Sequence, residues 1–528
     1  MSTPVRAPFS EDLISLRDQL PELLPLLEAK SHWYGSIYFE RKSTQIFSAN
    51  LKQTSVSDQK SRGAVLRIYD GVTLFEQATD ELDFDDLKTA CKKLADRAAR
   101  AEHSRSASLL RRPYTPPTWK ERLAPGLDPE IVSQIPAAAT AQTPVHFGIR
   151  YEVDPRPLTS AQRLERLRQI ISRCQELAPQ ASLTREDLSF ITARQSIAVE
   201  ESLFVDRESC MSQTLFRLGL TVIAMSGAER SVTRVGGLGG LETTDFTDKD
   251  ALELLQELRA MKNAEALTPG KYRVLFGPWL TGILAHEAFG HSQEADTCAR
   301  GRSKAWDLHK NSARVGNEHA TIINNPAAFT NGTSGHGAWG SYFFDEEGWL
   351  SQEQVLLERG YLHAPMTNLT SALRLGIPRS ANGKRESWAN GVYTRQTNTY
   401  FSAGKSTLNE LMEEMGDGFL ATSPAGGMED PKGMGIQVGI HFLQEVKNGK
   451  LTGRVFKGPS KGDIQLTGYV PDILEKIMDK SKIDFDAPEA DHAQHPFNAA
   501  GGCAKYHKEF VHAGCGGPYV LLDQVTLG

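Results

Sequence analysis

The segment from Ile283 to Asp296 constrains the fold of this chain more than any other. Within eleven residues it holds two histidines and three carboxylates: His286, Glu287, His291, Glu294 and Asp296. On a regular α-helix a residue at i+4 lies about 40° round the axis from residue i, whereas one at i+5 lies about 140° round. Because a straight helix cannot aim both imidazoles at one point, we predict either a one-residue π-bulge or a helix break near Gly290.

The chemistry of this segment favours a metal site. Imidazole nitrogens bind zinc, and a carboxylate beside them can accept a proton. Two histidines five residues apart are more often unrelated core or surface residues, so their spacing alone is weak evidence. The apolar run from Val274 to Ala285 strengthens the metal interpretation, because it brings these charges into a buried setting where they need partners or a metal. We therefore expect His286 and His291 to bind a metal.

A catalytic zinc usually has three protein ligands and one open position for water, so one ligand remains to be identified. The candidates are two nearby carboxylates and two distant thiols: Glu294, Asp296, Cys503 and Cys515. Thiolate binds zinc strongly, and the glycines before Cys503 give the backbone freedom to present it. A cysteine taken alone is more often an inert buried residue, so these grounds leave all four open.

Length and composition exclude several classes of protein. A chain of 528 residues is too long for one core and predicts two or three domains. A net charge of −6 offers no electrostatic footprint for nucleic acid. The longest apolar run is shorter than the ~20 residues that cross a bilayer, and residues 1–13 lack the apolar core of a signal peptide. Six scattered cysteines indicate a reducing compartment. We expect a cytoplasmic protein without direct nucleic-acid or membrane partners.

The order of local patterns predicts an α+β fold. One helix is expected after Asp83, with the apolar stripe Leu87, Cys91, Leu94 and Ala98, and a second helix is expected with Ser160 as its cap. Strand patterns cover 65–69, 191–204 and 215–225, which indicates a mixed α/β domain at residues 1–240. Seven prolines between 113 and 144 predict a connection with little regular structure. Short strands are expected at 437–446, 449–456, 462–470 and 519–525. They predict a strand-rich, antiparallel, barrel-like domain at residues 241–528 that carries the metal site.

Two glycine-containing segments imitate nucleotide-binding motifs. Residues 404–407 resemble the end of a phosphate-binding loop, but the glycine required five positions before Gly404 is Thr399. We interpret this segment as a turn that caps a helix beginning near Ser406. The glycine cluster at 236–240 lacks the Gly-x-Gly-x-x-Gly spacing of a dinucleotide site, and we interpret it as a domain boundary.

Several segments together resemble the TldD/PmbA family, cytoplasmic metallopeptidases also described as modulators of DNA gyrase. The resemblance rests on Pro269–Val274 leading to the His-Glu-x-x-x-His motif and Glu294-Ala295-Asp296, on Gly340–Gly348, on Arg395–Tyr400 and on Gly63–Phe75. It runs through most of the chain. The spacing of the two histidines within these surroundings is highly specific.

The resemblance implies a peptidase in which His286, His291 and Cys503 hold Zn²⁺ and Glu287 is the catalytic base. The family's cysteine is commonly followed by Gly-Lys; here Ala504 and Lys505 follow, so the lysine keeps its register and Cys515 stays the alternative. Unfolded peptides are the implied substrates, and the implied assembly is a homodimer or a heterodimer with a paralogous subunit.

Some points stay open at the level of sequence. His336 and Arg395 are our candidates for stabilising the oxyanion. A metal-stabilised scaffold without catalysis and a hydrolase of non-peptidic amides are the alternative functions.

Overall fold

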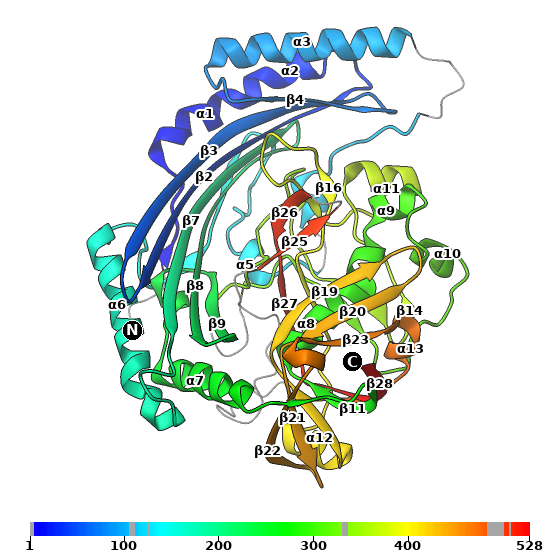
Figure 1. Ribbon diagram of the computed structural model, residues 1–528. Helices are drawn as coiled ribbons and strands as arrows, with labels where there is room; N and C mark the ends of the chain where they lie inside the picture. Colours follow the sequence, from blue (N-terminus) through cyan, green and yellow to red (C-terminus); the bar gives the residue numbers. More distant parts are fainter. Residues whose placement is uncertain (1–4, 105–110, 124–125, 330–335, 483–500, 506–507) are drawn as a thin grey trace.

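The computed structural model describes residues 5–104, 111–123, 126–329, 336–482, 501–505 and 508–528. Its largest feature is a seven-stranded sheet that curls like half a barrel (Figure 1). The strands follow the order β4-β3-β2-β7-β8-β5, and β9 also pairs with β8. Their bounds are β2 Tyr34–Asn50, β3 Thr54–Tyr69, β4 Leu74–Thr79, β5 Pro144–Gly148, β7 Phe190–Asp206, β8 Ser209–Ser226 and β9 Glu229–Leu238.

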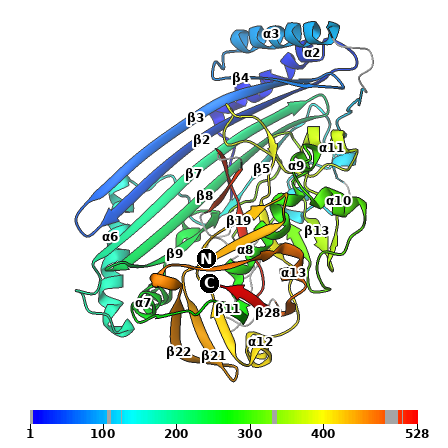
Figure 2. The same cartoon turned by 45° about the vertical axis from the view of Figure 1, so that its right-hand side comes forward.

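Helices cover the convex face of this sheet at both of its ends (Figures 1 and 2). At one end, α1 (Ile14–Gln19), α2 (Leu24–Leu27) and α3 (Phe84–His103) share a core with β2 and β3. At the other end, α6 (Ser160–Leu177) and α7 (Asp248–Lys262) share a core with β7 and β8. The concave face is therefore turned toward the C-terminal half of the chain.

The helices predicted from apolar spacing are present. In α3 the buried residues are those of the predicted stripe: Leu87, Cys91, Leu94 and Ala98. The second helix is present, but Ser160 is its first residue and not its cap; the cap is Thr159, whose hydroxyl accepts a hydrogen bond from the Gln162 backbone N–H. The Gln162 side chain returns a bond to the Thr159 backbone, and this capping box explains why Thr159 takes the cap position instead of Ser160.

The proline-rich connection inside the first predicted domain contains little regular structure, as expected. Among its described residues, the proline-rich stretch 113–144 forms two one-turn helices, α4 (Trp119–Arg122) and α5 (Pro129–Val132), before β5 begins. Helix α7 follows the glycine cluster at 236–240 yet packs in the core of the curled sheet. The division of the chain at residue 240 stays a prediction.

The C-terminal half is built on a second, ten-stranded sheet. Its order is β10-β22-β21-β18-β11-β28-β23-β20-β19, with β24 paired to β28. The bounds are β10 Glu265–Ala266, β11 Gly270–Phe276, β18 Gly418–Ala421, β19 Pro424–Asp430, β20 Gly435–Ile440, β21 Leu443–Lys447, β22 Lys450–Lys457, β23 Ile464–Tyr469, β24 Ile477–Lys480 and β28 Val520–Leu527. Most neighbours are antiparallel as predicted, but β10 with β22 and β11 with β18 are parallel.

One predicted strand is wrong in its extent. Residues 437–446 form parts of two strands, because β20 pairs with β19 and β23 whereas β21 pairs with β18 and β22. The chain changes its place in the sheet between Ile440 and Leu443. Residues 404–407 bend at Lys405 and hydrogen bond through their backbone to residues 480–482, so the predicted turn is a bend. It leads into α12 (Leu408–Met415), which Thr407 caps through a capping box with Glu410, so the helix begins two residues later than expected.

Helix α8 (Pro278–Ala285) lies between the ten-stranded sheet and a five-stranded sheet. The strands of the smaller sheet are β14 Tyr361–Leu362, β13 Gln354–Glu358, β12 Ile322–Asn324, β17 Asn398–Phe401 and β27 Gly514–Gly516. Gly282 of α8 lies directly on β27, where a Cβ atom would come 2.1 Å from the Gly516 backbone nitrogen. This close approach fixes the position of the residues that follow α8. None of the helices in the described residues is long and apolar enough to span a membrane.

Candidate metal centre

The two histidines are brought together by a π-turn. Residues His286–Gly290 continue α8 with π-helical geometry, and Phe289 leaves helical backbone angles at φ −133° and ψ 17°. The extra residue in the turn compensates for the i+5 spacing. The two imidazole rings lie nearly perpendicular, with centroids 4.9 Å apart. One of the two predicted alternatives, the π-bulge, is therefore observed.

The third member of the group comes from the far end of the chain. Cys503 lies in β25 (Gly502–Lys505), which pairs with β26 (Lys508–His512) as a two-stranded ribbon. The Cys503 Sγ atom is 3.4 Å from the His291 Nε2 atom. One ligand atom from each of His286, His291 and Cys503 lies within 4.8 Å of the other two, and no other such group of three is found in the described part of the chain.

The charges of this group suit a divalent cation. Burial alone would raise the pKa of the Cys503 thiol, but His291 and His286 hold that pKa well below its usual range. Burial opposes a charge on His291, yet Cys503 and Glu294 raise the pKa of His291 well above its usual range. Two imidazoles and a thiolate form a donor set that zinc prefers, and three protein ligands are the number found in catalytic zinc sites.

The Glu294 carboxylate contacts His291 and does not belong to the group formed by His286, His291 and Cys503. Its Oε2 atom lies 3.4 Å from the His291 Nδ1 atom and 2.9 Å from the Lys505 ammonium. Burial would raise the pKa of Glu294, but Lys505 and His291 hold it well below its usual range. A carboxylate in this position orients a metal-binding histidine and fixes its tautomer. Lys505 also binds Asp296 Oδ1 at 2.7 Å, so the other candidate carboxylate is likewise paired away from the ligand group.

The structure also describes three other residues that the sequence suggested: Cys515 as a metal ligand, and Arg395 and His336 as stabilisers of the oxyanion. Cys515 lies on β27 with its Sγ atom 4.0 Å from the Trp279 carbonyl, and burial raises the pKa of its thiol to about 12. Arg395 donates from Nη2 to the Cys503 carbonyl at 2.7 Å, and therefore positions the ligand strand. His336 lines a different cavity, together with Arg150 and Glu242. The structure does not bring Cys515 or His336 into the ligand group.

Glu287 is the residue that the sequence suggests as the base. It follows His286 directly and is buried, with 8% of its surface exposed. Its side chain packs against Gly427 of β19, where a Cβ atom would lie 2.7 Å from the Glu287 Cγ atom and 3.1 Å from its Oε1 atom. Glycine at this point of β19 therefore leaves the space that Glu287 fills.

Sequence reasoning did not find Glu429, a further acidic residue of the same region. Gly427 and Glu429 lie two apart on β19 and share one face of the strand. Burial raises the pKa of Glu429 well above its usual range; His291 opposes this rise and Glu287 adds to it. A single glutamate in a glycine-rich hairpin carries no periodic signal, so nothing in the local sequence marks it as buried.

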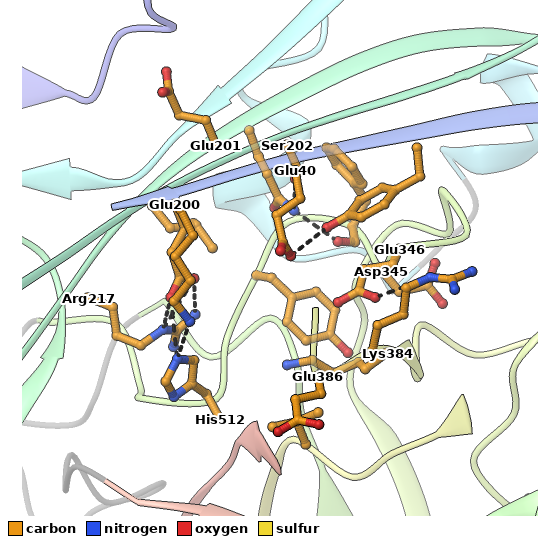
Figure 3. A pocket seen from close by; sticks show the side chains of 18 of the residues that line it. Glu40, Glu200, Glu201, Ser202, Arg217, Asp345, Glu346, Lys384, Glu386 and His512 are labelled. Carbon is orange, nitrogen blue, oxygen red and sulfur yellow. Dashed lines mark hydrogen bonds and ion pairs between the residues drawn. The ribbon is translucent and has the colours of Figure 1, made fainter. Parts of the chain in front are cut away.

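A second cavity lies between the curled sheet and β26 (Figure 3). At one side of it the Glu200 carboxylate pairs with Arg217 at 3.0 Å, Lys42 at 3.3 Å and His512 at 3.4 Å. Because Val511 of β26 is the register partner of Cys503, this cavity and the metal centre lie next to the same ribbon. The Glu200 cluster thereby fixes the ribbon that carries Cys503 to the curled sheet.

Comparison with known proteins identifies relatives of the chain. Residues 269–528 match the family described as PmbA/TldA metallopeptidase C-terminal domain. A metalloprotease of Methanocaldococcus jannaschii is 31% identical over 284 residues, which are 53% of this chain and 58% of that protein. A zinc metalloprotease TldD homolog of Saccharolobus solfataricus is 27% identical over 61% of this chain and 67% of that protein. The chain thus spans little more than half of the first relative's length.

The fold is also similar to that of solved structures. TldE from Thermococcus kodakarensis superposes with a TM-score of 0.62 at 14% identity, and the match covers 97% of this chain and all of that one. At this level of identity the similarity concerns the fold alone.

Proposed function

Because the chain belongs to the TldD/PmbA family, we propose that it is a zinc-dependent peptidase that hydrolyses peptide bonds of unfolded peptides. The observation that carries this proposal is the convergence of ligand atoms from His286, His291 and Cys503 within 4.8 Å of one another. The Glu287 residue directly follows His286 in the chain. Zinc held by these three ligands would supply Lewis-acid activation of water at neutral pH. Metalloprotease is also the name given to the sequence relatives.

Glu287 moves the proton in this mechanism. Its carboxylate accepts the proton of the attacking water and passes it to the nitrogen of the departing amine. Packing against Gly427 restricts where the carboxylate can lie. Glu294 and Lys505 hold His291, and Arg395 holds the Cys503 strand, so the ligands are positioned before substrate arrives.

An extended peptide can reach these residues by pairing with β19. This strand stands at the end of the ten-stranded sheet, and its Gly427 touches Glu287. Backbone hydrogen bonds to a strand edge hold a peptide largely independently of its side chains. Because a folded protein seldom offers a free extended segment, this mode of binding favours unfolded peptides. We propose that the substrate lies along β19 with its scissile carbonyl at the metal centre.

The assembly and location are part of the same proposal. We infer that the chain works as a homodimer or with a paralogous subunit, as the family resemblance implies. The retained ligand group supports the role of active subunit for this chain. The location inferred from the sequence is the cytoplasm.

Cleavage of an unstructured peptide library tests the function. The purified, zinc-loaded chain is incubated with the library, and products are identified by mass spectrometry. We expect cleavage by the wild-type chain, loss of cleavage in Glu287→Ala, and normal cleavage in Glu414→Gln, a change at an exposed position of α12. Unchanged cleavage in Glu287→Ala with zinc bound would show that Glu287 is not the base.

A further inference from the structure

Glu429 faces the metal centre from β19. Side chains two residues apart on a strand point to the same side, and Gly427 on that side touches Glu287 and Ile283 of the α8 segment. The Glu429 carboxylate accordingly interacts with the charges of His291 and Glu287. Glu429 takes no part in the proposed proton transfer by Glu287.

This carboxylate has no ion pair with a described residue; against the rise in pKa that burial causes, it has the charge of His291 and a weak hydrogen-bond interaction with the Ser292 side chain. Both of its oxygens are buried, and neither makes a hydrogen bond of normal geometry with any described residue. The nearby Ser292 hydroxyl donates to the Ala288 carbonyl at 3.4 Å. Among the cations of the centre, Lys505 binds Glu294 and Asp296, and Arg395 binds the Cys503 carbonyl. A buried carboxylate that has no cation beside it is neutralised by a proton, in line with the raised pKa of Glu429, and a cation brought by a bound molecule can take the place of that proton.

The position of Glu429 indicates which kind of molecule binds there. Glu429 is outside the group of three metal ligands, and it lies on the strand along which we place the substrate. The cation that a peptide brings to such a place is a primary ammonium, which offers three N–H donors to carboxylate oxygens. We propose that Glu429 binds a primary ammonium group of the substrate, in the first place the free α-amino group at the N-terminus of a peptide. This inference rests on the proposed peptidase function.

Three versions of one peptide test this inference in hydrolysis. The first has a free N-terminus, the second is N-acetylated, and the third is N-acetylated but carries a lysine beside the cleaved bond. We expect kcat/KM for the free peptide to exceed that for the acetylated one by about tenfold or more, and Glu429→Gln to abolish the difference. Rescue by the lysine peptide alone would identify the side chain as the source of the ammonium.

Control measurements separate this role from others. Glu414→Gln should behave like the wild type, and Glu429→Gln should keep its zinc. The inference is overturned if the wild type cleaves free and acetylated peptides equally, if Glu429→Gln slows both equally, or if Glu429→Gln loses its zinc.

A binding measurement keeps this inference distinct from the proposed function. Calorimetry with the zinc-loaded Glu287→Ala variant compares its affinities for the free and the acetylated peptide. Tighter binding of the free peptide, lost on adding Glu429→Gln, supports ammonium recognition even where the wild type cleaves neither peptide. Equal affinities overturn it even where the wild type is an active peptidase.

Discussion

At the scale of residues, Lys505 links the C-terminal part of the chain to its middle at the candidate metal centre. It stands two positions after Cys503 and reaches Glu294 and Asp296, which follow His291. Two carboxylates this close repel each other, and burial and Glu294 together raise the pKa of Asp296, which Lys505 opposes. Without the Lys505 ammonium, the Glu294 carboxylate would lose the neighbouring positive charge that helps to hold it beside His291.

Replacing Lys505 by methionine should therefore weaken zinc binding. We expect a loss of about 10–100-fold in zinc affinity, the range found when outer partners of metal ligands are removed. Competition with a chromogenic chelator measures it. The matched change Lys450→Met, at an exposed position of β22, should leave the affinity unaltered. Equal affinities for Lys505→Met and the wild type would show that the network does not support the site.

The site could be predicted from the sequence only in part. The i+5 spacing predicted either a π-bulge or a helix break, and the π-bulge is observed; this much was predictable because helix geometry is local. Cys503 is more than two hundred positions from His291, so the residues alone left four candidates and the family resemblance supplied the choice. Glu429 escaped prediction because its burial depends on where β19 packs.

At the scale of elements, the position of α8 and of its π-turn depends on Gly282. A Cβ atom there would lie 2.1 Å from the Gly516 backbone nitrogen, and backbone of a paired strand cannot move aside. Gly282→Ala should lower the free energy of unfolding by about 1–3 kcal/mol, the usual cost of overpacking, and should reduce turnover by displacing His286. Urea unfolding measures the first and peptide hydrolysis the second. Gly435→Ala, where the added methyl meets open space, is the control.

Helix α7 makes stability depend on pH. Burial raises the pKa of Glu257 to about 7; Ser231 donates a hydrogen bond that opposes the rise, and Glu253 adds to it. Because this folded value exceeds the unfolded value of about 4.3, the folded state binds more protons between the two values, and stability falls as pH rises through that window. Glu257→Gln should therefore raise Tm relative to the wild type at pH 8 and have little effect at pH 4. A Tm difference independent of pH would contradict this.

The ends of strands β20 and β21 depend on more than the local sequence pattern. Residues 437–446 alternate as one strand would, yet the chain breaks there because β20 and β21 have different partners in the sheet. The choice of partners depends on distant residues, and a local pattern does not contain it.

At the scale of the whole molecule, the curled sheet and the metal centre are coupled through β26. Glu200 of β7 gathers Arg217, Lys42 and His512, and His512 belongs to the ribbon that carries Cys503. Removing one member of such a cluster leaves the others without their counter-charge. Glu200→Gln should loosen the ribbon and weaken zinc binding severalfold. This loss is smaller than the loss of about 10–100-fold expected when a residue that directly contacts a metal ligand is replaced. Unchanged zinc affinity together with a lowered Tm would show that the cluster stabilises the fold alone.

X-ray absorption at the zinc edge tests the ligand group most directly. The purified, zinc-loaded chain should show two nitrogen ligands, one sulfur ligand and one exchangeable oxygen, because His286, His291 and Cys503 leave one position open. Cys503→Ser should remove the sulfur signal, and Cys515→Ser should leave it unchanged. A wild-type spectrum without sulfur, or one in which the sulfur persists in Cys503→Ser, would contradict a centre built from these three residues.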